Sequence, residues 1–366
     1  MNQSFVKPIV LVVLSAALAA CGAAKREHAM FMSDSRNTGF HATKDIVDGA
    51  TEIWSFQSGG AGFSTPVVIS GRLYVGSNDG NMYAFDATSG KRLWTYKAEG
   101  KIESSPAVFK GVLYFGSWDR HIYALNADDG TLLWRYKTGS QVYGSPTVFG
   151  SSVFIGSLDK HMYAFNATTG ELQWRFGSTG AIYSSPAVDG GNVYFGADDG
   201  FVYAVDVLTG QMVWRFGTKK PIYSSPAIEK NTVLIGSDDR FMRALHGATG
   251  RELWRFRTGN KISSTPAIFS NQVVFGSTDG YVYLVSRAGG RKTWEFKTYG
   301  AIFASPFLTE RIAYISSNDG SIYALSLESG EQLWKKELGV QLFASPVVDN
   351  GVLYIHDNEG KLTALK

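Results

Sequence analysis

Tryptophan recurs in this sequence every forty residues, and that interval restricts the fold more than any other feature of the chain. Proline follows the same interval from Pro66 to Pro346, and glycine follows it from Gly90 to Gly330. No insertion or deletion interrupts the series, so the chain is built from one repeated structural unit rather than from unrelated domains. The tryptophans on the interval are Trp54, Trp94, Trp134, Trp174, Trp214, Trp254, Trp294 and Trp334.

One repeat, residues 102–141, shows what the unit contains. Short runs rich in β-branched and aromatic residues alternate with turn signals such as Lys110-Gly111 and Asp128-Asp129-Gly130. Four antiparallel strands in a unit of about forty residues are typical of one blade of a β-propeller. The predicted strands are Ser104–Phe109, Val112–Gly116, His121–Asn126 and Thr131–Lys137.

The two ends of the repeat region predict the number of blades. Residues 51–57 have the pattern of a fourth strand with no first three before it, and residues 360–366 have that of a third strand with no fourth after it. Seven complete repeats lie between them. If the N-terminal strand completes the C-terminal blade, the fold is an all-β, eight-bladed propeller whose ring is closed without an exposed sheet edge.

The segment from the third to the fourth strand carries a family resemblance. It reads AFDATSGKRLW up to Trp94, AFNATTGELQW up to Trp174 and AVDVLTGQMVW up to Trp214. These segments resemble the tryptophan-docking motif of the PQQ-like, or quinoprotein-type, repeat propellers. The resemblance covers residues 51–366 and implies that each repeated tryptophan packs against the neighbouring blade. Propellers of this type include quinone-dependent alcohol and glucose dehydrogenases and the non-catalytic BamB family of outer-membrane assembly lipoproteins.

The N-terminal region predicts an envelope location. An apolar run from Ile9 to Ala20 is shorter than the ~20 residues needed to span a bilayer, and it ends at Cys21, the single cysteine of the chain. The pattern resembles a bacterial lipoprotein signal. We therefore expect residues 1–20 to be a signal peptide, Cys21 to be lipidated, and residues 21–50 to be a tether, partly packed around Met30, Phe31 and Phe40. The protein is then anchored in the outer membrane with residues 51–366 facing the periplasm.

The residue three positions before each repeated proline should lie near one mouth of the central channel. Six of these residues are aromatic, and the two that are not lie four blades apart and should face each other. The set can form a collar that grips an extended peptide or a planar ligand, with Glu103 as its polar handle. Alternatively, the rings plug the axis or pack between blades. The residues are Phe63, Glu103, Tyr143, Tyr183, Tyr223, Ser263, Phe303 and Phe343.

A second candidate surface is basic. Arg120, Lys160 and Arg240 occupy turn positions where other repeats have glycine. They can form a patch for an acidic partner or lipid headgroups, or they are simply solvated turn residues. The overall net charge of +3 gives no reason to expect nucleic-acid binding.

No catalytic constellation and no metal-binding motif is found in the sequence, and we expect no cofactor. The predicted function is that of a monomeric, non-catalytic protein-interaction platform in the envelope. The BamB resemblance implies that its partners include the outer-membrane β-barrel assembly machinery. The alternative is a PQQ-dependent dehydrogenase or a propeller that senses a quinone or another ligand.

Overall fold

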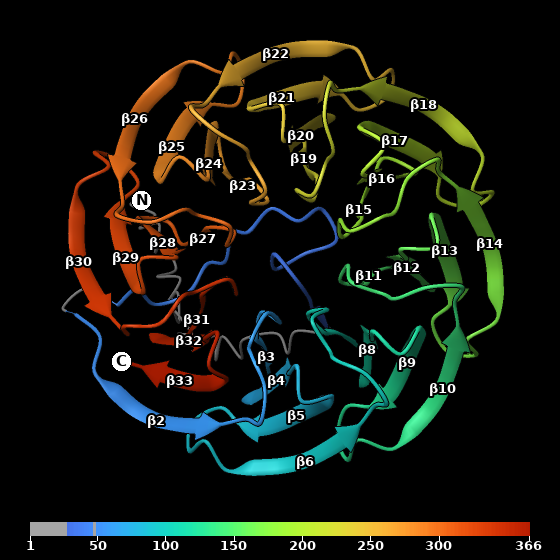
Figure 1. Cartoon of the computed structure of the whole chain (residues 1–366), viewed down its shortest axis with the longest axis horizontal. Coiled ribbons are helices and arrows are strands. Elements are labelled where there is room, and N and C mark those ends of the chain that lie inside the picture. The colour runs from blue at the N-terminus through green and yellow to red at the C-terminus, as the bar shows by residue number, and fades with distance from the viewer. Residues whose placement is uncertain (1–27, 47–48) are drawn as a thin grey trace, which may run out of the picture.

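The computed structural model describes residues 28–46 and 49–366. In this part of the chain the strands form eight sheets, which are arranged as blades around a central channel (Figure 1). The all-β, eight-bladed fold expected from the repeat interval is confirmed. Among the described residues, no helix is long and apolar enough to cross a membrane.

Each blade is an antiparallel sheet whose first strand lies at the channel and whose fourth lies at the rim (Figure 1). The strands of blades 1 to 4 are β3 (Val67–Ile69), β4 (Arg72–Gly76), β5 (Asn81–Asp86), β6 (Arg92–Lys97), β7 (Ala107–Phe109), β8 (Val112–Gly116), β9 (His121–Asn126), β10 (Leu132–Lys137), β11 (Thr147–Phe149), β12 (Ser152–Gly156), β13 (His161–Asn166), β14 (Leu172–Gly177), β15 (Ala187–Asp189), β16 (Asn192–Gly196), β17 (Phe201–Asp206) and β18 (Met212–Gly217). Those of blades 5 to 8 are β19 (Ala227–Glu229), β20 (Thr232–Gly236), β21 (Phe241–His246), β22 (Glu252–Arg257), β23 (Ala267–Phe269), β24 (Gln272–Gly276), β25 (Tyr281–Ser286), β26 (Lys292–Lys297), β27 (Phe307–Leu308), β28 (Ile312–Ser317), β29 (Ser321–Ser326), β30 (Gln332–Glu337), β31 (Val347–Asp349), β32 (Val352–His356), β33 (Lys361–Leu365) and the N-terminal β2 (Glu52–Gln57).

The first strand of each blade is shorter than its sequence pattern suggests. In the second blade it covers Ala107–Phe109, whereas the pattern predicts Ser104–Phe109. Pro106 lies between the two starting points and has no N–H to donate to a β-ladder, so pairing begins only after it. The second and third strands of this blade have the predicted bounds.

The ring closes through β2, as predicted. β2 pairs antiparallel with β33, from Glu52 opposite Leu365 to Gln57 opposite Lys361. Beyond the strand, the backbone N–H groups of Thr51 and Lys366 each donate to the other residue's carbonyl at 2.8 Å. The last blade therefore combines three C-terminal strands with one N-terminal strand, and both ends of the propeller are held in one sheet.

The repeated tryptophans lie between blades. The indole N–H of Trp54 donates to the carbonyl of Ala87 at 3.0 Å, and the same bond recurs 33 residues ahead of each tryptophan from Trp94 to Trp294. Trp334 uses a different acceptor. Its indole N–H donates instead to the carbonyl of Ile46 at 2.8 Å. A residue from before the propeller thus replaces the missing acceptor.

The turns between second and third strands are held by a repeated aspartate. Asp79 accepts hydrogen bonds from the backbone of Asn81 and Gly59 and from the hydroxyl of Tyr83. Burial disfavours the ionised form of Asp79, but these bonds outweigh it, and the pKa of Asp79 lies below its usual value. In the fifth blade Arg243 replaces the tyrosine and binds both carboxylate oxygens of Asp239, at 2.9 and 2.6 Å.

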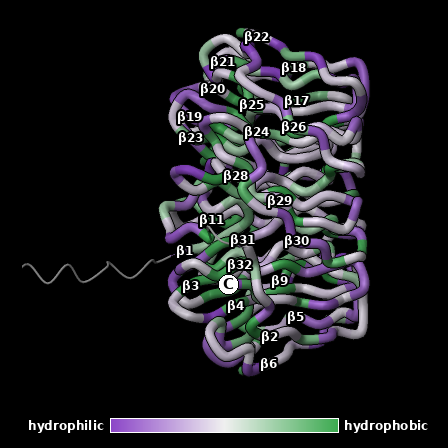
Figure 2. Tube along the Cα trace, turned by 90° about the vertical axis from the view of Figure 1, so that its left-hand side faces the viewer, coloured by the Kyte–Doolittle hydropathy of each residue, from purple (hydrophilic) through white to green (hydrophobic). Residues whose placement is uncertain are grey.

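Residues 28–46, which we call the strap, are packed against the propeller in a region that the sequence assigns to a tether. β1 (His28–Ala29) pairs with β7, and the carbonyls of Ser35, Arg36, Thr38 and Gly39 accept hydrogen bonds from the first strands of the fourth to seventh blades. The strap therefore satisfies backbone donors of edge strands that line the channel. In side view the apolar residues concentrate inside the disc (Figure 2).

Candidate binding site

The propeller has two faces, which differ in the turns that they present. The turns between second and third strands lie beside the connections between blades, as the Gly59 N–H to Asp79 bond shows; we call this side the mouth face. The other two sets of turns lie together on the opposite side, where the backbone of Ala87 bonds Gly71; we call this the far face. The strap crosses the channel toward the far face, beside residues such as Pro186 and Pro226.

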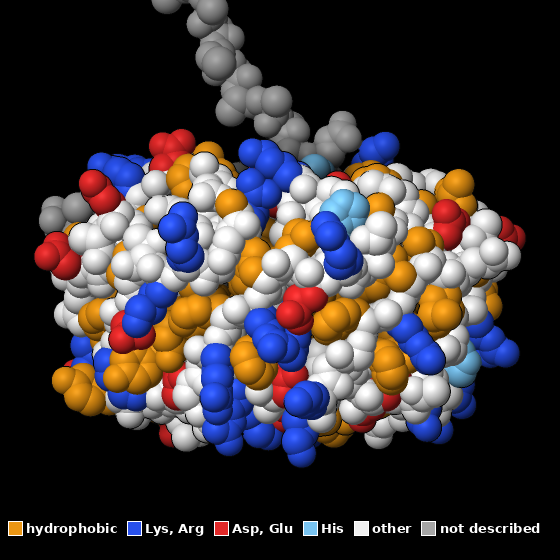
Figure 3. All heavy atoms as spheres, turned by 90° about the horizontal axis from the view of Figure 1, so that it is seen from above, with side chains coloured by type: hydrophobic (Ala, Val, Ile, Leu, Met, Phe, Trp, Pro, Cys, Tyr) orange, Lys and Arg blue, Asp and Glu red, His pale blue; other side chains and the backbone are white. Residues whose placement is uncertain are grey.

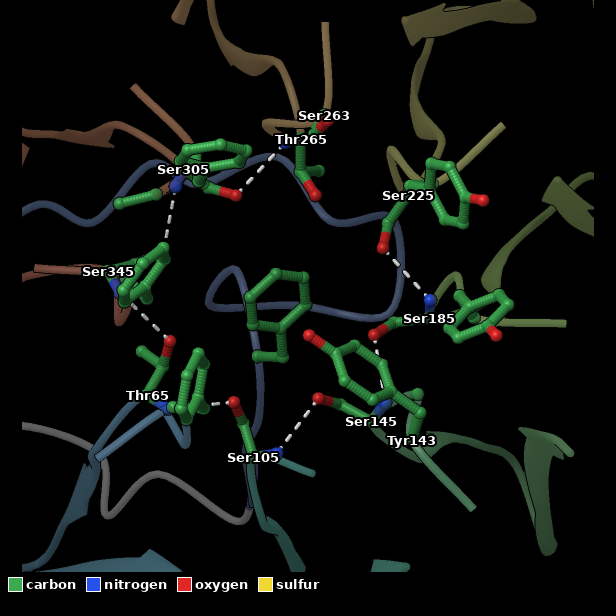
Figure 4. Close-up of a pocket in the computed structure, with 18 of the residues that line it drawn as sticks. Thr65, Ser105, Tyr143, Ser145, Ser185, Ser225, Ser263, Thr265, Ser305 and Ser345 are labelled. Atoms are coloured by element: carbon green, nitrogen blue, oxygen red, sulfur yellow. Dashed lines mark hydrogen bonds between the residues drawn. The ribbon is translucent and has the colours of Figure 1, made fainter. Parts of the chain in front are cut away.

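A cavity of about 520 Å³ occupies the channel on the mouth side (Figure 4). We call it the cup. Phe31 of the strap lines it, and the strap's fully buried Asn37 donates from its amide to the carbonyls of Pro186 and Pro226, at 3.1 and 3.0 Å. The strap thus forms a floor, and the cup has the size of an ordinary small-ligand pocket.

All eight residues predicted for the collar line this one cavity. The six aromatic rings form two arcs. Phe303, Phe343 and Phe63 make one arc, with ring centroids 5.6 and 5.0 Å apart. Tyr143, Tyr183 and Tyr223 make the other, with edge-to-face contacts at 5.6 and 5.2 Å. The rings contact one another around the cavity, so the axis is not plugged by them.

The arcs are separated by the two non-aromatic collar positions. Glu103 accepts a hydrogen bond from the side chain of Asn78 at 3.1 Å. Burial raises the pKa of Glu103, an effect partly offset by Asn78, by the charge of Lys101 and by Trp118. Burial also raises the pKa of the neighbouring Tyr143 to about 12, and its hydroxyl reaches into the channel (Figure 4).

The opposite break, at Ser263, holds an ion pair. Lys261 contacts Asp238 at 2.8 Å, and both residues line the cup. The Asp238 carboxylate is only 8% exposed, and its second oxygen has no hydrogen-bond partner among the described residues. The cup therefore has polar side chains in both gaps of the collar, with the two aromatic arcs between them.

Below the collar lies a ring of hydroxyl groups from the residue before each repeated proline. The hydroxyl oxygen of one blade accepts the backbone N–H of the blade before it, at 2.9–3.2 Å, in seven of the eight neighbouring pairs that the described residues form (Figure 4). None of these hydroxyls donates to an acceptor among the described residues, so each O–H is free to bond a group inside the cup. The ring consists of Thr65, Ser105, Ser145, Ser185, Ser225, Thr265, Ser305 and Ser345.

Sequence reasoning missed the role of this hydroxyl ring. The recurring Ser or Thr before proline is visible in the sequence, but it suggests only an extended backbone. Its bonds form between residues forty positions apart, which a single repeat does not show. Phe31 was also missed as a cup residue, because the strap has no regular period.

The remaining predicted residues are placed as follows. Arg120, Lys160 and Arg240 lie in second-to-third-strand turns on the mouth face and are exposed. The eight repeated tryptophans lie at blade boundaries, away from the cup. Residues 1–20 and Cys21 lie outside the described residues. Within residues 28–46 and 49–366, no group of three or more His, Cys, Asp or Glu side chains could hold a metal ion.

Comparisons with known proteins agree with this architecture. Residues 198–299 and 278–366 match the family described as outer membrane protein assembly factor BamB, and residues 69–246 match the β-propeller of the β-alanine-activating enzyme. The chain is thus a β-propeller that resembles the PQQ-like repeat class. BamB is among the proteins that it resembles, both by family model and by structure. No curated protein matches the sequence.

Solved structures show the same fold at low sequence identity. The crystal structure of BamB from Moraxella catarrhalis is 20% identical, with 87% of this chain and 98% of that chain covered and a TM-score of 0.75. The quinohemoprotein alcohol dehydrogenase from Comamonas testosteroni is 16% identical, with 94% and 81% covered and a TM-score of 0.80. The computationally designed protein Ika8 is 18% identical, with 86% and 99% covered and a TM-score of 0.79.

The structural match to a quinohemoprotein alcohol dehydrogenase raises the question of whether the cup fits pyrroloquinoline quinone. This cofactor is a planar tricarboxylate, so a buried site for it needs several cations or bound metal. Among the described residues that line the cup, Lys261 is the one cationic side chain, and it is already paired with Asp238. Glu103 adds a further carboxyl group. The residues of the cup do not fit this cofactor.

Proposed function

We propose that this protein is a non-catalytic lipoprotein of the bacterial envelope whose mouth face binds protein partners during outer-membrane protein assembly. The observation that carries the proposal is the cup. Eight blades each supply one residue to a collar of two aromatic arcs, and the strap closes the channel beneath it. Aromatic side chains at the centre of an interface often contribute a large share of its binding free energy.

The match of residues 198–366 to the BamB assembly factor family supports the choice of process. The propeller itself supplies a rigid support, because both of its ends are fixed in the last blade. A rigid surface with aromatic anchors loses little conformational entropy on binding. The partners we propose are envelope proteins, among them the outer-membrane β-barrel assembly machinery.

Site-specific photo-crosslinking in cells tests this proposal. A photoreactive residue replaces Tyr223 or Phe303, which are 40% and 39% exposed at the collar. We expect ultraviolet-dependent adducts with components of the outer-membrane assembly machinery. The matched control replaces Leu208, which is 82% exposed in a third-to-fourth-strand turn on the far face. Absence of collar adducts, or the same adducts from Leu208, would overturn the proposal.

Catalysis is tested directly on the purified protein. With added pyrroloquinoline quinone and Ca²⁺, we expect no dye-linked oxidation of alcohols or sugars above that of a heat-denatured sample. Sustained turnover that depends on the native protein would show that the binding function is not the whole activity, and it would contradict the non-catalytic proposal.

The lipid anchor gives a further expected result. Cys21→Ser removes the thiol that a lipoprotein signal requires, so we expect the protein to move from the membrane fraction to the soluble periplasmic fraction. Fractionation of cells expressing each form, with detection by immunoblotting, measures the change. An unchanged membrane fraction would show that another contact attaches the protein to the membrane.

A further inference from the structure

The mouth face carries a strong excess of exposed positive charge. The exposed acidic side chains of its turns and blade connections are Glu99 and Glu359. The repeated aspartates are instead turned inward and hydrogen bonded, as Asp79 is. Lys and Arg side chains project along the lower margin of the disc, where the mouth face lies (Figure 3). The exposed basic residues of this face include Lys101, Arg120, Lys160, Lys219, Lys220, Arg240 and Lys261.

Three of these basic residues have a backbone conformation that is unfavourable for any residue other than glycine. Arg120, Lys160 and Arg240 each have φ of 73°, in the left-handed region, whereas the equivalent turns of the other five blades have glycine at φ 81–85°. Glycine adopts this backbone conformation without steric cost, whereas a residue with a Cβ atom adopts it only at a cost. The turn geometry therefore does not itself favour a basic residue at these three positions.

The cup at the centre of this basic face favours an apolar group with oxygen acceptors. The two arcs offer aromatic surfaces, and the hydroxyl ring offers O–H donors that no described residue accepts. Its two acidic groups already have partners: Asp238 is paired with Lys261, and Glu103 accepts a hydrogen bond from Asn78. Carbonyl or carboxylate oxygens can bond the hydroxyls, and aromatic or aliphatic side chains can contact the arcs.

We propose that the mouth face binds an acidic segment of a protein partner, whose apolar tip enters the cup while its Asp and Glu side chains pair with the surrounding lysines and arginines. This inference rests on the proposed function and specifies the partner's chemistry. The strap closes the channel beneath the cup, so the segment enters and leaves through the mouth as a loop or chain end. An anionic lipid surface also carries negative charge, but a flat bilayer does not fill a recessed cavity.

The test uses three fluorescent peptides of twelve residues with the full-length protein. The first has Asp and Glu flanking a central Phe-Tyr pair; the second has Asn and Gln in those flanks; the third has Ser-Ser at its centre. We expect the first to bind, and each of the others to bind about tenfold more weakly by fluorescence anisotropy. Raised salt should weaken binding of the first peptide most.

The variant that isolates the charges is the triple Arg120→Gly, Lys160→Gly and Arg240→Gly. It installs the residue that the other blades use, so folding is preserved while three cations are lost. We expect about tenfold weaker binding of the acidic peptide. The matched control is Lys110→Gly with Lys230→Gly, since both lysines also have positive φ, 48° and 49°, but lie in first-to-second-strand turns on the far face. That control should bind like the parent.

The outcomes separate this inference from the proposed function. Equal binding of the acidic and amide peptides, or no loss in the triple variant, would overturn it. So would binding to phosphatidylglycerol vesicles with no binding of any peptide. If collar crosslinks persist in the triple variant, protein binding stands and the acidic-segment inference is wrong. If the parent gives no collar crosslinks, the proposed function itself is wrong.

Discussion

Trp54→Ala is expected to lower the free energy of unfolding by about 3 kcal/mol or more, because it removes the main apolar contact of the strand that closes the ring. The indole packs against Phe85 and Tyr354, with ring centroids 6.2 and 5.9 Å away, and its N–H bonds Ala87 at 3.0 Å. It thereby joins the last blade to the first. Denaturant-induced unfolding, followed by intrinsic fluorescence and by circular dichroism, measures the loss.

The matched control is Ile53→Ala in the same strand. Ile53 is 44% exposed, so its removal should change the free energy of unfolding by less than about 1 kcal/mol. Deletion of residues 51–57 removes the whole pairing with β33 and should destabilise the protein more than either substitution. An unchanged midpoint in Trp54→Ala would show that closure by β2 contributes little, and that the blades are held by their other contacts.

The features that could be predicted from sequence are those repeated in every blade. Each repeat independently shows the strand pattern and the tryptophan interval, and the incomplete repeats at the two ends give the blade number and the closure. The collar was predicted for a similar reason, because residues at one repeat position must lie at one level of the channel. Phe63 and Phe343 are neighbours for this reason, although 280 positions separate them.

Two of the features that could not be predicted arise where repetition ends, and the third depends on contacts between blades. The strap has no period, and its backbone bonds depend on where the first strands of other blades expose their N–H groups. The replacement of the missing acceptor for Trp334 by Ile46 depends on the same three-dimensional arrangement. The hydroxyl ring was missed because its members bond one another only after the ring has formed.

The seam between the last blade and the first departs from the packing of the other seams in a complementary way. At six seams a glycine ends the second strand and contacts a β-branched residue of the next blade connection, as Gly76 does with Ile102. At the closing seam the sizes are exchanged: His356 takes the glycine position and Gly62 takes the β-branched position. A Cβ on Gly62 would lie 2.3 Å from the His356 ring, so the pair fits only in this combination.

His356 also makes this seam sensitive to pH. Its ring is fully buried, the Nδ1 atom has no partner among the described residues, and Nε2 lies 3.3 Å from the Ser58 hydroxyl. Burial lowers the pKa of His356 to about 4, below the usual value of 6.5. The unfolded chain therefore binds a proton between pH 6.5 and 4 that the folded protein excludes. This contribution to stability is complete above pH 6.5 and is lost as the pH falls toward 4.

Exchanging the pair tests both the packing and the titration. Gly62→Ile alone should clash with the histidine, and His356→Gly alone should leave a cavity, so each should lower the free energy of unfolding by about 2–4 kcal/mol. The double variant restores the combination found at six of the other seams and should recover most of that loss. Urea unfolding of all four proteins at pH 7 measures the coupling.

Urea unfolding of the same four proteins at pH 7 and at pH 4.5 measures how much the protonation of His356 changes the free energy of unfolding. The parent should lose about 2–3 kcal/mol more than the double variant over this range, because only the parent buries a neutral imidazole. Other titrating groups, including Glu103, are present in both proteins and cancel in the comparison. At pH 7, a loss in the double variant equal to the sum of the two single losses would contradict complementary packing. Parallel pH profiles would show that the imidazole reaches solvent, or is protonated, in the folded ring.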